Sequence, residues 1–146
     1  MLEVERSALR LSPDEWIIAL YGSDIAGDAL DAARDPVENA LWELAARVLT
    51  LGIDVILENG FWSRSEREDF RARAARLGAR SELHYAQATE EELLCRLEKR
   101  NAQLPAGSFR IEEARLRIWL ELFEPPDVDE LQPGEVLIES PDNHSA

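Results

Sequence analysis

Ala8-Leu9-Arg10-Leu11-Ser12-Pro13-Asp14-Glu15 joins a strand-like run to a helix start without an intervening loop. Ser12 is a favourable N-cap, and Pro13 suits the first helical position because its missing N–H would have no partner there. Acidic residues follow in the first turn, where they complement the helix dipole. The stretch predicts a strand that leads directly into a helix, as in a βα unit.

Strand-like and helical patterns continue to alternate along the chain. Asp35-Pro36 opens a helical pattern whose apolar residues recur every three or four positions up to Leu51, and Gly52 closes it. The mostly apolar run at 53–57 suits a parallel strand buried on both faces. The other predicted elements are a helix from Ser63 or Ser65 to Gly78, a strand at 82–86, a helix from Glu90 to about Asn101 behind a Thr89/Glu92 capping box, a helix at 111–123 and a last strand at 135–138. This alternation indicates an α/β fold with a largely parallel sheet covered by helices on both faces.

Composition indicates one globular domain. We place it at residues 1–140, with 141–146 as a disordered tail, since hydrophobic residues make up 45% and charged residues 32% of the 146. No apolar run approaches the roughly 20 residues that cross a bilayer, and the start lacks a basic segment followed by an apolar one, so we expect a cytoplasmic protein. The formal net charge of −14 argues against a broad nucleic-acid interface, which needs Lys and Arg to neutralise phosphates.

The single cysteine, Cys95, cannot form an internal disulfide. His84 and His144 are the only histidines, so the chain has no zinc-ligand spacing. We interpret Cys95 as a buried helix residue.

Polar residues follow the first two predicted strands, at the carboxyl ends where open α/β sheets bind ligands. A carboxylate at a helix N-terminus stays ionised, so Asp14 can accept a proton from a hydroxyl, and complementing the helix dipole explains this residue equally well. A capping box alone accounts for Ser12 and Glu15. Glu58 follows the second strand, like the acidic strand end that orients Mg²⁺ and water in NTPases.

Four segments together resemble the AAA-domain P-loop kinases, which are ATP-binding proteins related to chloramphenicol phosphotransferase, zeta toxins and polynucleotide kinases. They are Leu11-Ser12-Pro13-Asp14-Glu15-Trp16, Val55-Ile56-Leu57-Glu58-Asn59-Gly60-Phe61-Trp62-Ser63-Arg64, Arg96-Leu97-Glu98-Lys99-Arg100-Asn101 and the stretch from Phe109 to Glu124. The resemblance extends from about Ala8 to Pro126. It implies a three-layer parallel sheet with helices on both faces, ATP and Mg²⁺ as cofactors, and transfer of phosphate to a hydroxyl of a small molecule.

The resemblance also implies roles for the two acidic residues. Asp14 would act as the base toward the substrate hydroxyl. Glu58 would lie near Mg²⁺ and contact it through water.

Four arginines would surround the nucleotide if the resemblance holds. Arg96 and Arg100 would lie on a lid-like helix and contact its phosphates, and Arg64 and Arg67 would face the same cleft. Each pair also has a structural explanation. Arg96 and Arg100 suit pairing with Glu92 and placement near a helix C-terminus, and the other two suit a solvated helix face.

The family's phosphate-binding loop, G-x-x-x-x-G-K-[ST], has no counterpart in the chain. Its glycines let backbone N–H groups wrap the phosphates while its lysine reaches them. The only lysine here is Lys99, and none of the seven glycines precedes a lysine. We therefore expect the family's first strand and Walker A loop to lie upstream of Met1, with Met1 to Arg6 as the tail of the following helix.

Three interpretations follow. The functional protein is a longer, ordinary ATP-dependent kinase, and the 146 residues alone are inactive. Alternatively, the chain is a truncated paralogue that serves as a binding or regulatory module. In the third interpretation, a partner or a second copy fills the gap in the sheet, because unpaired strand edges invite association.

Overall fold

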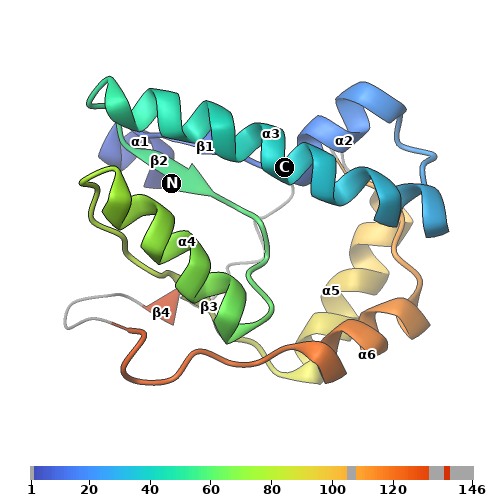
Figure 1. The fold of residues 1–146 in the computed structure, drawn as a ribbon. Coiled ribbons are helices and arrows are strands. Elements are labelled where there is room, and N and C mark those ends of the chain that lie inside the picture. The colour runs from blue at the N-terminus through green and yellow to red at the C-terminus, as the bar shows by residue number, and fades with distance from the viewer. Residues whose placement is uncertain (1, 105–107, 132–136, 139–146) are drawn as a thin grey trace.

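The protein is described by a computed structural model over residues 2–104, 108–131 and 137–138. Strands and helices alternate along the chain, as the sequence predicts (Figure 1). The strands are β1 (Leu9–Leu11), β2 (Val55–Leu57), β3 (Tyr85–Ala86) and β4 (Leu137–Ile138). The helices are α1 (Leu2–Arg6), α2 (Pro13–Tyr21), α3 (Gly27–Thr50), α4 (Arg64–Arg76), α5 (Glu90–Gln103) and α6 (Glu113–Leu122).

The strands form two separate parallel pairs within the described residues. β1 pairs with β2, with Leu11 opposite Leu57, and β3 pairs with β4, with Tyr85 opposite Leu137. The α/β class and the parallel pairing are thus confirmed, whereas the three-layer sheet with helices on both faces stays a prediction. The strands are shorter than expected, and residues 135–136 and the expected tail at 141–146 lie outside the described residues.

Local capping signals place the starts of α2, α4 and α5 correctly. The Ser12 hydroxyl accepts a hydrogen bond from the backbone N–H of Glu15 at the start of α2, and Pro13 occupies the first helical position. At α5, Thr89 and Glu92 form both hydrogen bonds of the predicted capping box. Ser63, rather than Ser65, caps α4. Only the box at α2 is incomplete, because the Glu15 carboxylate pairs with Arg10 instead of reaching back to its own helix start.

The start of α3 corrects one prediction. The helix begins at Gly27 rather than at Asp35-Pro36, and Pro36 lies inside it. A proline within a helix removes one backbone hydrogen bond. This loss is offset because an apolar stripe continues through the proline: Leu30, Ala33, Val37, Leu41 and Ala45 are all buried. Burial of such a stripe against a core provides most of a helix's stability in a protein.

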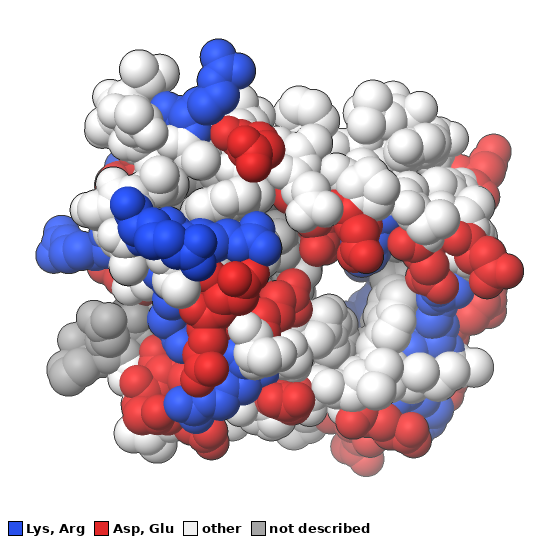
Figure 2. All heavy atoms as spheres, viewed as in Figure 1, with Lys and Arg blue, Asp and Glu red and all other residues white. Residues whose placement is uncertain are grey.

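The main core lies between α2, α3 and the β1–β2 pair. Leu11, Ile17, Leu41 and Phe109 are buried together there. α4 contacts α3 through Trp42 and Phe70, whose rings meet edge to face at 5.5 Å. On the opposite side, α5 and α6 lie side by side (Figure 1). Figure 2 shows an opening between these two sides, with acidic side chains gathered on its rim.

The exposure of Cys95 and the polarity of the helices test two further predictions. Cys95 is exposed on α5, so its interpretation as a buried residue is wrong. Within the part of the chain that the structure describes, no helix is both long and apolar enough to span a bilayer.

Candidate functional site

The parallel β1–β2 pair brings the two predicted polar segments to one edge. The backbone N–H of Glu58 donates to the carbonyl of Leu11 at 3.0 Å, just where both strands end. Ser12 and Asp14 therefore begin α2 beside the start of the loop that carries Glu58 and Asn59. This neighbourhood is the one the sequence predicts from the carboxyl ends of parallel strands.

Arg10 links the start of α2 to the loop after β2. Its guanidinium donates to Glu15 at 2.6 Å and to Glu58 Oε2 at 3.0 Å, and its side chain is mostly buried. Hydrogen bonding to Glu15 is the main cause that raises the pKa of Arg10. As a result, one oxygen of Glu58 is already engaged by the protein.

Asp14 has a cationic partner that the sequence analysis missed. Arg34 Nη1 on α3 lies 3.2 Å from Asp14 Oδ1 and 3.9 Å from Glu38 Oε1. The Asp14 side chain is 41% exposed, so its carboxylate is accessible from solvent. Arg34 and Glu38 are an i,i+4 pair, a spacing visible in the sequence once the helix is known to start before Asp35.

Glu38 lies in a crowded acidic environment. Its side chain is 15% exposed, and burial is the main cause that raises its pKa to about 7, against the opposing effect of Arg34. The carboxylates of Glu66, Asp35 and Asp14 raise it further. Burial likewise raises the pKa of Glu66, at the start of α4, although backbone N–H groups of the preceding loop oppose this. The two carboxylates thus belong to one partly desolvated cluster beside Asp14.

The loop after β2 has an unusual backbone. Gly60 (φ 87°) and Phe61 (φ 53°) are both left-handed, and a Cβ at Gly60 would lie 2.7 Å from Trp62 Nε1. A left-handed non-glycine residue such as Phe61 costs on the order of 1–3 kcal/mol, and such strain often marks functional sites. Asn59 is only 6% exposed, and its Oδ1 accepts no hydrogen bond from a residue that the structure describes. The sequence pointed to this loop because polar residues follow the second predicted strand, but it did not indicate the left-handed backbone at Phe61.

Arg64 and Arg67 are engaged by the protein itself. Arg64 forms ion pairs with Asp127 at 2.7 Å and Asp129 at 2.6 Å, which raise its pKa. Arg67 is 3% exposed and holds Glu130 through a two-pronged hydrogen bond of 2.8 and 3.1 Å. These contacts account for both arginines without a ligand, and their predicted role toward a nucleotide stays a prediction.

Arg96 and Arg100 contrast with that pair. They are one helical turn apart on α5, and neither side chain forms a hydrogen bond or an ion pair with a described residue. The Nε atom of Arg100 is buried and has no hydrogen-bond partner in the described part of the chain. Arg96 only adds to the lowering of the Glu92 pKa, which is due mainly to the backbone N–H of Thr89. Arg96 thus acts on Glu92 only through a weak electrostatic attraction, without an ion pair between the two described side chains.

The family model described as AAA domain matches residues 2–126. The chain belongs to the AAA domain family. This is a P-loop kinase-like family that includes proteins of the chloramphenicol phosphotransferase type. Comparisons with curated proteins and with solved structures find no match.

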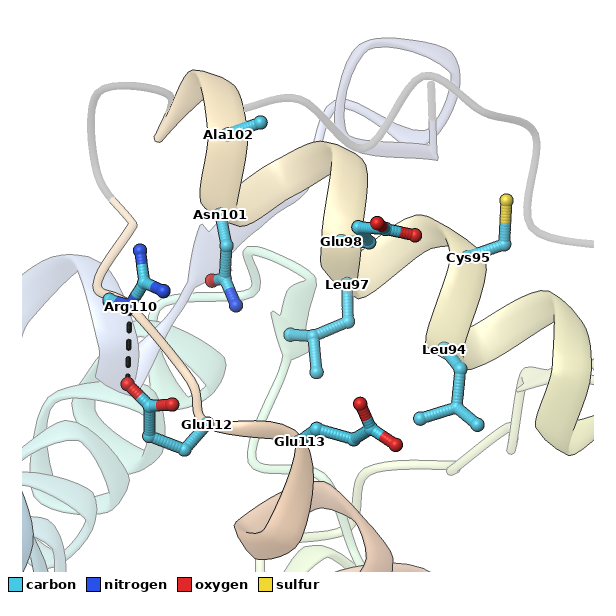
Figure 3. Close-up of a pocket in the computed structure, with 9 residues that line it drawn as sticks. All are labelled: Leu94, Cys95, Leu97, Glu98, Asn101, Ala102, Arg110, Glu112 and Glu113. Carbon is cyan, nitrogen blue, oxygen red and sulfur yellow. Dashed lines mark hydrogen bonds and ion pairs between the residues drawn. The ribbon is translucent and has the colours of Figure 1, made fainter.

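A pocket of about 640 Å³ lies between α5 and α6 of this AAA domain (Figure 3). Leu94 and Leu97 line it from α5, and Glu112 and Glu113 from the start of α6. Asn101 braces the pocket, because its amide donates to the Ile111 carbonyl at 2.6 Å and accepts from the Ile111 N–H at 3.2 Å. None of the predicted site residues lines this pocket.

A metal site formed by the protein alone does not fit the residues of this AAA domain. Within the described ranges, no three His, Cys, Asp or Glu side chains are arranged to hold a metal ion. Glu58 offers one oxygen at most, because Arg10 engages the other. Mg²⁺ usually keeps several waters and binds one or two carboxylates together with substrate phosphates. In such an arrangement Glu58 would supply at most an accessory contact, through water, to an ion held by a nucleotide, and this role stays a prediction.

Proposed function

We propose that this AAA domain provides the acceptor side and the lid of an ATP-dependent phosphotransferase whose substrate is a hydroxyl of a small molecule. The observation that carries the proposal is the contrast among its arginines. Arg64 and Arg67 are engaged by carboxylates, whereas the half-buried Arg96 and Arg100 have no described partner. An unpaired, partly buried guanidinium is costly, so its retention favours an anionic ligand such as a phosphate chain.

Asp14 suits the role of base in this proposal. It stands at the carboxyl end of β1, it is accessible, and Arg34 holds only one of its two oxygens. The other oxygen can accept the proton of a substrate hydroxyl as that hydroxyl attacks the terminal phosphate. General-base assistance of this kind contributes roughly 10²–10⁴ in rate.

The phosphate-binding loop has to come from outside these residues, because the sequence contains no G-x-x-x-x-G-K-[ST]. In such enzymes, Mg²⁺ bound to ATP neutralises the charge that develops on the transferred phosphate. Loss of a single stabilising donor can lower the rate about 10²–10³-fold. The 146 residues alone are therefore expected to bind Mg·ATP weakly and to transfer no phosphate.

A second candidate function is a non-catalytic binding or regulatory module. The split sheet favours it, since β2 and β3 each leave one edge without a strand partner among the described residues. Unpaired edges are templates for strand addition, so self-association through them belongs to this alternative.

Two measurements on the 146-residue chain separate these functions. Calorimetry should find millimolar or weaker affinity for Mg·ATP, and micromolar affinity would contradict the need for an external loop. Sedimentation over a hundredfold range of protein concentration tests the alternative. A concentration-dependent mass would favour the module, and a constant monomer mass would count against it.

A further inference from the structure

Residues 124–130, which we call the strap, run back from the end of α6 to the loop after β2. The backbone N–H of Glu124 donates to the Trp62 carbonyl at 2.8 Å, and the Glu124 carboxylate accepts from the backbone N–H of Arg64 at 3.1 Å. The strap therefore closes on both the loop and the first turn of α4.

Arg67 lies at the centre of this contact. In addition to its paired hydrogen bonds with Glu130, its Nη1 donates to the Phe61 carbonyl at 2.9 Å and to the Glu124 carbonyl at 2.8 Å. Glu130 also accepts from Arg71 and from the backbone N–H of Asp127. Hydrogen bonds to Arg67 are the main cause that lowers the pKa of Glu130 to about 2. The pair is thus buried, ionised and well satisfied.

Stability alone does not explain a buried ion pair. An apolar pair of similar volume is often as stable or more stable, because it avoids the cost of desolvating two charges. What an apolar pair cannot do is donate to two backbone carbonyls at once. One of these carbonyls belongs to Phe61, the left-handed residue two positions after Asn59.

We propose that Arg67 is a positioning residue that fixes the strained loop at residues 58–62, and with it Glu58 and Asn59 at the carboxyl end of β2. The use of that loop in phosphate transfer rests on the proposed function, but its fixation by Arg67 does not. Arg67 then acts through the backbone of Phe61, and its guanidinium stays buried away from the nucleotide.

The test compares hydrogen exchange of loop 58–62 in the ligand-free 146-residue protein and its variants. In the double variant Arg67→Met/Glu130→Leu, we expect the urea midpoint to equal or exceed that of Arg67→Met alone, because no unpaired charge stays buried. The amides of loop 58–62 should nevertheless exchange roughly tenfold faster than in wild type, the effect of losing the hydrogen bond from the Arg67 side chain to the Phe61 carbonyl. Exchange in α3 should be unchanged.

Arg71→Met is the matched control, because Arg71 contacts Glu130 but not the loop backbone. It should leave loop exchange at the wild-type rate. If the double variant does not fold, Arg67→Lys serves instead. Lysine keeps a positive charge beside Glu130, but it lacks the planar guanidinium that bonds Glu130 and the Phe61 carbonyl at the same time. It should also loosen loop 58–62. The proposal would be overturned if the amides of loop 58–62 exchanged at the wild-type rate in the double variant or in Arg67→Lys. It would also be overturned if exchange became faster to the same extent in the loop and in α3. Mg·ATP binding that persists without Arg96 and Arg100 would instead count against the proposed function, and it would leave the role of Arg67 in the loop untouched.

Discussion

Glu38→Gln is expected to stabilise the protein, and to do so more as the pH rises. The pKa of Glu38 is about 7 in the folded state against 4.5 in the unfolded state, because the carboxyl group is buried beside other carboxylates. An acid whose pKa is raised by folding is tolerated best below its unfolded pKa, and stability is lost as the pH rises through the folded pKa. The difference of about 2.5 pKa units corresponds to about 3 kcal/mol once Glu38 is ionised.

Glutamine has nearly the same shape and stays neutral, so the substitution removes this penalty. Urea unfolding at pH 8.5 should show a gain of about 3 kcal/mol, and at pH 5 a gain below about 1 kcal/mol. Glu43→Gln is the matched control, because Glu43 is exposed on the same helix, and it should change stability by less than about 0.5 kcal/mol at either pH. A Glu38→Gln variant that is no more stable than wild type at pH 8.5, or whose gain is the same at both pH values, would show that this carboxylate is not desolvated as described.

Three other outcomes are expected. Glu130→Gln should lower the free energy of unfolding at pH 7 by about 3 kcal/mol, because it leaves Arg67 buried without its charge partner. Since the pKa of Glu130 is lowered to about 2, the free energy of unfolding of the wild type should fall as the pH drops from about 5 toward 2. An equally steep fall in Glu130→Gln would contradict the role of the Arg67–Glu130 pair. Asp14→Asn, in an assembly that transfers phosphate, should reduce turnover about 10²–10⁴-fold and leave ATP affinity unchanged, whereas an equal loss of both would mean that Asp14 only stabilises the start of α2. Cys95 should react with a thiol reagent in the native protein at the rate of a small-molecule thiol, because it is exposed, and a reaction that needs urea would contradict this placement.

Features that depend on near neighbours were predictable from the sequence. Ser12, Ser63 and Thr89 cap their helices through backbone groups only three residues away, so a local pattern is sufficient. The start of α3 was not predictable in this way. Pro36 is a local signal for a helix start, and burial of Leu30 and Ala33 against the core outweighs it.

The arginines show the same limit at the candidate site. Arg64 and Arg67 look like Arg96 and Arg100 in the sequence, since all four lie on helices with acidic neighbours. Arg64 pairs locally with Glu68, but the other carboxylate partners of the first pair come from the strap about 60 positions away, and only the folded chain brings them together. The sequence likewise gave no reason to connect Arg34 with Asp14, since their pairing depends on how α3 packs on α2.

The assignment of the nucleotide phosphates to α5 can be tested by a Mg·ATP titration of the 146-residue chain followed by NMR. We expect millimolar binding, with the largest shift changes in the side chains of Arg96 and Arg100. The double variant Arg96→Ala/Arg100→Ala should abolish these changes, whereas Arg64→Ala should leave them in place. Shift changes centred on Arg64 and Arg67, or binding that survives the loss of both α5 arginines, would contradict the assignment.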